Sequence, residues 1–523
     1  MWKQRKKSSL LVLLVTLTLT MPPLVNAIGW SGETRLTTHS SWDGQPSIAQ
    51  IDNGDIWLVW QAKRSTTLDI YYKIHFNDNG TWSLDRRLPR VPLEPERDDI
   101  GPYIIQSRNG TMWVFWAMNR TWPMIDYDIV YRQSNDYGLT WSNTFSVTNS
   151  LQVPSEAYND KGPSVLEASD GDLWVVWTRT TSSGNDEIFY KVNHAGSWTS
   201  EVQLTNYPGF DRNPSIVQAR NGSIMIFWSK YVGATDYDIV YRAYNGTDWG
   251  PERNLTQTPT WLSSDPSAML ARNGTLWVFW SAQDVIDPET DTTLFYKTSN
   301  NNGDTWSSTI KLVYDLSYNA QPSATQGSDK KIWVAWVSNR DANFDVYYKT
   351  SDQILYHDVA ITGISLSETS VYQGTNILVT VNATNKGDYT ETLNVKCYAN
   401  QTLIGTQATP LAGGTSTSLV FPWDTSTFTP GTYYMKATVD PVPNENVINF
   451  VDNTLISDPM LVRILGDINA DGRVDADDLS RLSAALGSTP GQSTWDQECD
   501  INANNIVDVN DLYILSSNYG ITV

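Results

Sequence analysis

Near its C-terminus the chain carries oxygen-bearing side chains at a spacing that could hold a metal ion. In the stretch "DINADGRVDADD", aspartate or asparagine stands at positions 1, 3, 5, 9 and 12 of a twelve-residue loop, with glycine at position 6 for a sharp turn. These residues are Asp467, Asn469, Asp471, Asp475 and Asp478, with Gly472 at the turn and the main-chain carbonyl of Arg473 at position 7. Ca²⁺ prefers oxygen ligands at this spacing, so the stretch predicts a calcium loop.

A second copy of this loop follows in the stretch "DINANNIVDVND". Its side chains are those of Asp500, Asn502, Asn504, Asp508 and Asp511, with the carbonyl of Ile506 at position 7. Asn505 replaces the glycine, and asparagine tolerates the left-handed conformation, so we expect this loop to form but to bind more weakly. Each loop leads into a short apolar helix. We therefore expect two calcium ions; the alternative is a disordered acidic tail.

The duplicated loop and helix, with each loop ending in Asp rather than Glu, resemble a type I dockerin. The resemblance covers residues 465–523. It implies that this segment docks onto cohesin modules of a scaffold or surface protein.

A second set of acidic residues stands three positions before recurring prolines. Its members are Asp43, Asp99, Asp160 and Asp211, with Ser263 and Asn319 at two further copies. Brought together by symmetry, four carboxylates could bind a cation or act as acid and base. The alternative is that each aspartate only opens an Asx-turn before its proline.

Basic and aromatic residues lie close to two of these aspartates in the sequence. Lys161 and Arg212 each follow an aspartate directly, and Trp122 and Tyr231 lie in neighbouring predicted loops. Arginine binds carboxylates and aromatic faces stack on sugar rings, so this set would suit an acidic glycan. Single surface aromatics are common, which leaves an ordinary protein surface as the alternative.

The prolines belong to a sixfold repeat that must position all of these side chains. Pro46, Pro102, Pro163, Pro214, Pro266 and Pro322 are each followed fourteen residues later by a tryptophan. Asn-Gly or Asp-Gly turns between them predict hairpins in five copies, and the sixth has the weaker turn Asp329-Lys330. Strands of the type "DIVYR" and a strand opened by tryptophan complete each unit. Four short strands a unit predict a six-bladed β-propeller, and the period-2 alternation excludes a helical solenoid.

The last blade lacks a fourth strand, and the other end of the repeat region can supply it. The segment "WSGETRLT", Trp30 to Thr37, matches "WGPERNLT", Trp249 to Thr256, almost residue for residue. We expect it to form the outer strand of the sixth blade and to close the ring without an exposed edge.

The stretch "SNDYGLTW", Ser134 to Trp141, recurs in weaker form as "SNNNGDTW". It resembles the Asp-box of sialidase-type propellers. The resemblance implies a fold device in which Asp136 braces a hairpin, Gly138 takes a left-handed turn and Trp141 is buried.

The blades and Asp-boxes together resemble the sialidase superfamily over residues 28–353. Catalytic members use a tyrosine nucleophile with a glutamate, an acid/base aspartate and three arginines. The nearest match to the first arginine is Arg212 in "FDRNP", in a different blade, and the other groups cannot be placed. The resemblance therefore carries the fold, and it leaves open whether the chain is an enzyme.

Residues 354–464 alternate apolar and polar side chains between Gly, Pro and Thr turns. This pattern predicts an Ig-like sandwich of about seven strands, and it resembles CARDB-type modules of prokaryotic surface proteins, which implies spacing or adhesion. The predicted fold class is therefore mainly β, with a small α-helical module at the end. Cys397 and Cys499 are the only cysteines and fall in different segments, so we expect two separate thiols.

The first 27 residues combine a basic start, an apolar run and a small-residue cleavage site after Ala27. They predict a secretory signal peptide, with an uncleaved membrane anchor as the alternative. The formal net charge of −21 argues against nucleic acid and anionic membranes as partners.

These features favour a secreted, carbohydrate-associated modular protein. Its propeller would bind or process a glycan, and its dockerin would attach it to cohesin, in polysaccharide breakdown or cell-surface assembly. A sialidase-like glycoside hydrolase or lyase, and an adhesion protein with a protein ligand, are the alternatives.

Overall fold

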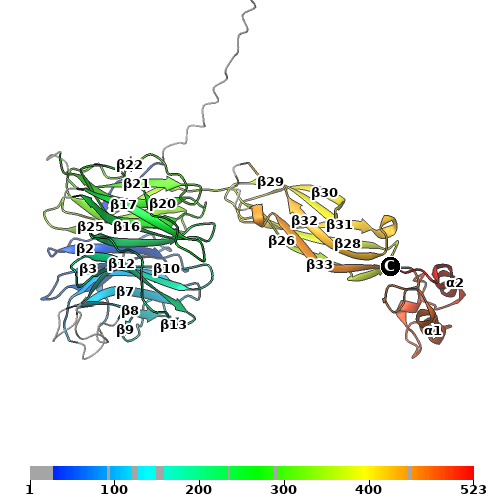
Figure 1. Ribbon diagram of the computed structural model, residues 1–523. Coiled ribbons are helices and arrows are strands. Elements are labelled where there is room, and N and C mark those ends of the chain that lie inside the picture. Colours follow the sequence, from blue (N-terminus) through cyan, green and yellow to red (C-terminus); the bar gives the residue numbers. More distant parts are fainter. Residues whose placement is uncertain are drawn as a thin grey trace, which may run out of the picture.

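The computed structural model describes residues 28–90, 95–119, 126–148, 158–233, 236–286, 291–443, 445 and 450–522. Figure 1 shows three bodies that follow one another along the chain: a rounded assembly of strands, an elongated sandwich of strands, and a small helical body. The expected signal peptide, residues 1–27, and the rim residue Trp122 lie outside the described residues.

The rounded assembly is built from six repeated antiparallel sheets, or blades. The first has β2 (Asp43–Gln50), β3 (Ile56–Ala62), β4 (Asp69–His75) and β5 (Arg86–Arg87), and the second has β6 (Asp99–Gln106), β7 (Met112–Asn119), β8 (Tyr127–Ser134) and β9 (Phe145–Ser146). The third has β10 (Asn159–Glu167), β11 (Leu173–Thr180) and β12 (Asp186–His194), with the short β13 (Ser197–Trp198) and β14 (Val202–Gln203).

The other three blades have the same order of strands. The fourth has β15 (Asp211–Gln218), β16 (Ile224–Gly233), β17 (Asp236–Tyr244) and β18 (Arg253–Asn254), and the fifth has β19 (Trp261–Leu270), β20 (Leu276–Asp284), β21 (Thr293–Ser299) and β22 (Ile310–Lys311). The sixth has β23 (Asn319–Gln326), β24 (Lys331–Ser338), β25 (Asp345–Gln353) and β1 (Thr34–Arg35). The innermost strands β2, β6, β10, β15, β19 and β23 contact one another in a closed ring, which is a β-propeller.

The ring closes through the start of the described chain, as the sequence predicts. Thr34 and Arg35 of β1 pair with Tyr348 and Tyr347 of β25, and Trp30 forms a further bridge with Ser351. This pairing covers the outer edge of β25 and leaves no open end to the ring.

The hairpin turns form as predicted, but the outer strands are shorter. The second turn residue has a positive φ in every blade, from 81° to 91° at the five glycines and 67° at Lys330. The fourth strand starts about four residues after the expected tryptophan and has two residues in each blade. Three of these tryptophans form isolated bridges instead, Trp30 with Ser351, Trp82 with His75 and Trp249 with Tyr244, and Trp198 pairs with Asn193 in β13.

Hydrogen bonds between neighbouring blades explain why serine follows the blade proline in five of the six copies. The serine hydroxyl accepts the main-chain N–H of the next innermost strand at 2.9 to 3.2 Å. The acceptors are Ser47, Ser164, Ser215, Ser267 and Ser323. Tyr103 replaces the serine in the second blade, where its hydroxyl is bonded to Ser164 and to the main chain of Val165. Each bond satisfies a buried N–H and ties two blades together.

The Asp-box has the predicted role of a fold device. Asp136 accepts hydrogen bonds from the N–H and hydroxyl of Thr140 and from the hydroxyl of Ser134, and Gly138 has a φ of 80°. Trp141 is half-buried rather than fully buried, and its ring lies edge-on to Trp57 of the preceding blade at 6.4 Å. The box therefore braces a turn and also joins two blades.

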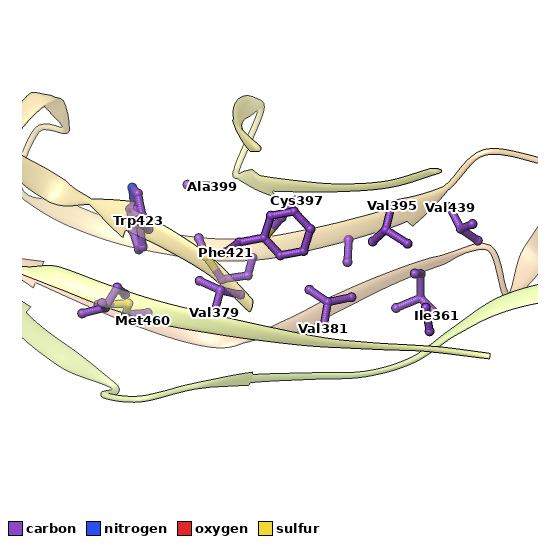
Figure 2. Packing of buried hydrophobic residues seen from close by; sticks show 14 of the residues in the cluster. Ile361, Val379, Val381, Val395, Cys397, Ala399, Phe421, Trp423, Val439 and Met460 are labelled. Atoms are coloured by element: carbon purple, nitrogen blue, oxygen red, sulfur yellow. The ribbon is translucent and has the colours of Figure 1, made fainter. Parts of the chain in front are cut away.

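The elongated body is an Ig-like sandwich of two sheets. One sheet has β26 (Val359–Leu366), β28 (Asn376–Asn385) and β31 (Ser416–Asp424). The other has β27 (Ser370–Tyr372), β33 (Thr454–Arg463), β32 (Gly431–Val439), β29 (Glu391–Ala399) and β30 (Thr402–Leu411), and a 3-10 turn (Thr425–Thr427) follows β31. Figure 2 shows the core between the sheets, where Val379, Val381, Phe421 and Cys397 lie together. Cys397 and Cys499 are both buried free thiols, as expected.

The last body contains α1 (Ala476–Ala485), the 3-10 turn Gln497–Cys499 and α2 (Val509–Asn518). Its small core includes Ile468, Val474, Leu482, Val507 and Leu515. Asp475 and Asp508 are the N-caps of the two helices, and Asp478 and Asp511 complete a capping box at each. The residues at loop positions 9 and 12 thus also start the helices.

Candidate functional sites

The first predicted calcium loop is folded around two buried carboxylates. Asp467 accepts the N–H groups of Asp471 and Gly472 at 3.1 and 3.2 Å. Asp478 accepts those of Ile468 and Asp475 at 2.7 and 2.9 Å. Asp467 and Asp478 are 1% and 0% exposed, so the two ends of the loop are drawn toward its centre.

The second loop has the same network thirty-three positions later, from Asp467 to Asp500. Asp500 accepts from the N–H groups of Asn504 and Asn505 at 3.0 and 2.8 Å. Asp511 accepts from Asn502 and Asp508 at 3.1 and 2.8 Å. Two segments that share a spacing therefore share a fold.

The carboxylates of the first loop repel one another, and a bound cation would reduce this repulsion. Burial raises the pKa of Asp467, and the negative charges of Asp478 and Asp471 raise it further. No group of three or more His, Cys, Asp and Glu side chains that could hold a metal occurs in the described part of the chain. The predicted ligand sets also include asparagine and main-chain oxygens. Their donors are hard oxygens, which suit Ca²⁺.

The four aspartates before the prolines lie inside the blades rather than around the channel. Each accepts a hydrogen bond from a tryptophan indole 17 residues further on, at 2.9 to 3.1 Å. The pairs are Asp43 with Trp60, Asp99 with Trp116, Asp160 with Trp177 and Asp211 with Trp228. Burial raises the pKa of Asp99 to about 7 and that of Asp211 to about 6. The structure thus assigns these carboxylates a bonded place in the sheet and does not bring them together.

The channel is lined instead by the residue directly before each proline. These residues are Gln45, Gly101, Gly162, Asn213, Asp265 and Gln321, and all six have a φ between 48° and 60°. Each innermost strand has a β-bulge at this position. The residue three positions before the proline lies before the bulge and faces the interior of the blade, and the residues at the bulge line the channel. The central cavity has a volume of about 140 Å³.

Lys161 and Arg212 line one cavity together with an acid, Asp186. They line a cavity of about 370 Å³ between the third and fourth blades. Asp186 also lines it, forms an ion pair with Arg212 and accepts a hydrogen bond from Thr180 at 2.6 Å. Burial lowers the pKa of the Lys161 ammonium, whose nitrogen lies 4.6 Å from the ring centre of Tyr127. Arg212 is 40% exposed and can meet a ligand.

Tyr231 belongs to an aromatic group beside this cavity. Its ring is 6.0 Å from Phe210 and 5.4 Å from Tyr237, and the guanidinium of Arg212 lies over Phe210 at 4.2 Å. Asp186, Phe210 and Tyr237 are not among the site residues predicted from the sequence. Phe210 stands two residues before Arg212 in the stretch "FDRNP", which is a signal that could have identified it, whereas Asp186 is 26 residues away from Arg212 and no sequence signal connects them.

No helix in the described ranges is long and apolar enough to cross a membrane.

Comparisons with known proteins identify two of the three bodies. Residues 357–449 match the CARDB family, and residues 465–518 match the family described as Dockerin type I domain. A search of curated proteins finds no match to the chain.

Solved structures resemble the propeller at low sequence identity. A protein of unknown function from Dyadobacter fermentans DSM 18053 is 11% identical with a TM-score of 0.53, over 63% of this chain and 100% of its own. An α-L-arabinanase of Penicillium chrysogenum complexed with arabinobiose is 16% identical with a TM-score of 0.46, over 61% and 98%. A Hadza microbial sialidase is 15% identical with a TM-score of 0.45, over 59% and 65%. The first likeness shows the fold alone, and the other two carry no argument about function.

Type I dockerin domains bind calcium and have cohesins as their partners. The duplicated loop network, the small helical core and the family match agree for the same segment. Residues 357–449 are therefore a CARDB module, and residues 465–518 are a type I dockerin domain.

Proposed function

We propose that this chain is a secreted component of a cohesin-based assembly, and that its propeller presents a binding site for an acidic glycan. We take residues 28–353 as the propeller, 354–464 as the spacer and 465–523 as the dockerin. The observation that carries the proposal is the duplicated hydrogen-bond network of the two loops within a dockerin match.

The dockerin holds two calcium ions in this proposal, one in each loop. The ligands of the first are Asp467, Asn469, Asp471, Asp475 and Asp478 with the carbonyl of Arg473. Those of the second are Asp500, Asn502, Asn504, Asp508 and Asp511 with the carbonyl of Ile506. Bound calcium neutralises carboxylates that otherwise repel one another, so calcium binding and folding of the module are coupled.

The glycan would bind at the cavity between the third and fourth blades. Lys161 and Arg212 supply positive charge for a carboxylate, and Phe210, Tyr231 and Tyr237 supply aromatic faces beside it. The ion pair between Arg212 and Asp186 holds the guanidinium in place before the ligand arrives. Trp122 stays a predicted member of this site.

Cohesin capture by the full-length protein tests the first half of the proposal. Asp467→Ala with Asp478→Ala should weaken calcium-dependent capture by about tenfold or more, because both buried loop carboxylates are lost. Asp477→Ala is the matched control, since Asp477 is an exposed acid of the same helix. Chelation should unfold the dockerin and leave the tryptophan fluorescence of the propeller unchanged. Equal helicity of the C-terminal segment in EDTA and in excess calcium would show that the loops do not bind calcium as proposed.

A glycan array tests the second half. We expect the wild-type protein to bind carboxylate-bearing glycans, and Lys161→Ala with Arg212→Ala to lose that binding. Lys63→Ala, at an exposed cation of another loop, should have no effect. Turnover is measured on every hit, and we expect none on a generic sialoside, because Arg212 is the single arginine among the described residues that line the cavity. Turnover that Arg212→Ala abolishes would make the propeller an enzyme.

A further inference from the structure

Five of the six blades have the same arrangement of side chains around the tryptophan that stands fourteen residues after the blade proline. An acid or amide at the start of the innermost strand accepts the indole N–H, and a cation stands near it. In the third blade, Asp160 lies opposite Arg179, and the two side chains are 2.6 Å apart. In the sixth blade, Asn319 accepts both Trp336 at 3.0 Å and Arg340 at 2.8 Å.

The first, second and fourth blades follow the same rule with other cations. Arg64 lies 3.4 Å from Asp43. Lys230 stands opposite Asp211, and Arg90 and Arg132 lie close enough to Asp99 to favour its charged form. The buried acid or amide is thus paired with a cation whenever it is present.

The fifth blade breaks this rule at both positions. The cross-strand pair that corresponds to Asp160 and Arg179 is Ser263 and Ala282. Ser263 is 1% exposed, and its hydroxyl has no hydrogen-bond partner. Among the described residues, no acceptor is recorded for the indole N–H of Trp280 and no cation lies over its ring.

The missing side chains leave a pocket between the fourth and fifth blades. Its volume is about 950 Å³, and we call it the blade-5 pocket. Its walls come from the segment after β17 and from β19, β20 and β21, which lie in the green part of the propeller in Figure 1. The side chains that matter are Trp261, Trp280, Phe295, Ser263, Thr258 and Lys297.

The pocket combines an aromatic wall, of which Trp261 is the partly exposed ring, with hydroxyl groups that have no partner. Phe295 lies 5.4 Å from Trp261 and 6.1 Å from Trp280, so three rings form one apolar wall. The hydroxyl of Thr258 is buried without a partner, as is that of Ser263. A buried hydroxyl without a partner destabilises the protein, and a ligand that bonds to it recovers that loss.

The charged side chains that line the blade-5 pocket have hydrogen-bond or ion-pair partners within the protein. The ammonium of Lys297 donates to the carbonyl of Leu255 at 2.7 Å. Glu252 pairs with Lys230 at 2.6 Å, and Arg253 pairs with Asp304 at 3.2 Å. Two of these three charged groups are thus neutralised by ion pairs, and burial lowers the pKa of the third, Lys297, which disfavours its charged form.

We propose that the blade-5 pocket binds a neutral sugar unit of an oligosaccharide. The C–H face of the sugar would stack on Trp261, which Phe295 and Trp280 support from behind, and its hydroxyls would bond to the unpaired hydroxyls of Ser263 and Thr258. This site is separate from the Lys161 and Arg212 cavity in position and in charge, so it does not depend on the acidic-glycan proposal.

The test measures binding of a panel of neutral arabino-, xylo-, gluco-, manno- and galacto-oligosaccharides to the full-length protein by calorimetry. Ser263→Asp with Ala282→Arg builds the third-blade pair into the fifth blade and fills the pocket. This variant should lose binding while its melting temperature is retained. Trp261→Ala, at a partly exposed residue, should weaken binding by about tenfold or more and does not depend on the double variant folding.

Three results would overturn the proposal. The first is that the wild type binds no neutral oligosaccharide. The second is that binding survives in both variants. The third is that an alkyl alcohol of similar size binds as tightly as the sugar. Lys161→Ala with Arg212→Ala is the control, and it should leave neutral-sugar binding unchanged. Loss of binding in that control would place the sugar at the other cavity and would also count against the blade-5 pocket. Failure of acidic-glycan binding with neutral binding intact would reject only the proposal for that cavity.

Discussion

The buried carboxylate of Asp99 shows how a single residue can make the stability of a blade depend on pH. Its indole bond to Trp116 is 2.9 Å long, yet burial raises its pKa to about 7. The folded state therefore holds a proton more tightly than the unfolded chain does, between the ordinary pKa of 3.8 and about 7. The contribution of Asp99 to the free energy of unfolding is therefore fully present below pH 3.8, and it is lost as the pH rises through about 7.

We expect Asp99→Asn to stabilise the propeller at pH 8 by about 1–3 kcal/mol and to have little effect near pH 4. Asparagine can keep the indole bond, because Asn319 accepts Trp336 in the same way in the sixth blade. Urea unfolding of both proteins across this pH range measures the difference. Asp248→Asn removes an exposed negative charge and serves as the control. An equal change at every pH would mean that Asp99 is not protonated in the folded protein.

At the scale of the element, the calcium loops and the helices that follow them share residues. Asp478 and Asp511 accept loop N–H groups and also complete the capping boxes of α1 and α2. The loops differ at position 6, where Gly472 has a φ of 83° and Asn505 has a φ of 69°. Asparagine pays a small backbone strain there that glycine does not.

We expect Asn505→Gly to strengthen the second calcium site by about 0.5–1 kcal/mol, because it removes the left-handed strain. Gly472→Asn is the reciprocal variant and should weaken the first site by a similar amount. Calcium titration of dockerin folding, followed by circular dichroism, measures both. If Asn505→Gly leaves the titration unchanged, position 6 does not account for a difference between the loops.

At the scale of the whole molecule, short polar contacts join the three bodies. Lys330 of the propeller pairs with Asp388 of the sandwich at 2.6 Å. At the other junction, Arg463 pairs with Glu498 and lies over the ring of Tyr372 at 4.4 Å. The dockerin is thus tied to β33, the last strand of the sandwich, through Glu498, which lies two residues before its second loop. The propeller itself is closed by β1.

Deletion of residues 28–38 should lower the melting temperature of the propeller and cause aggregation. The deletion exposes the edge of β25 and removes Trp30, whose ring lies 5.9 to 6.5 Å from Trp277, Phe279 and Tyr296. Trp30→Ala keeps the strand pairing and should give a smaller loss without aggregation. Size-exclusion chromatography and thermal unfolding measure both variants. A truncated protein that stays monomeric with an unchanged melting temperature would contradict closure by β1.

The features that could be predicted correctly are those that depend on residues close together in the chain. The hairpin turns, the strand alternation and the twelve-residue calcium spacing are local, and the repeat made the match between the first strand and the last blade visible. This is why the propeller, the sandwich, the dockerin and the role of the Asp-box could all be predicted. Lys161 and Arg212 occupy the same position in consecutive blades, and the structure places both at one cavity.

How side chains from different strands share space could not be predicted, because it depends on the folded arrangement of those strands. The sequence predicts Asp43 and its equivalents around the channel, whereas each of them accepts a tryptophan indole inside its blade, directly before a β-bulge. A β-bulge changes the face of the sheet on which the following residues lie, and no particular residue type marks its position. The alternation of apolar and polar residues therefore cannot reveal where a bulge occurs. The blade-5 pocket arises because two small residues, Ser263 and Ala282, face each other across a pair of strands. Each is ordinary alone, and the space they leave exists only once the strands have paired.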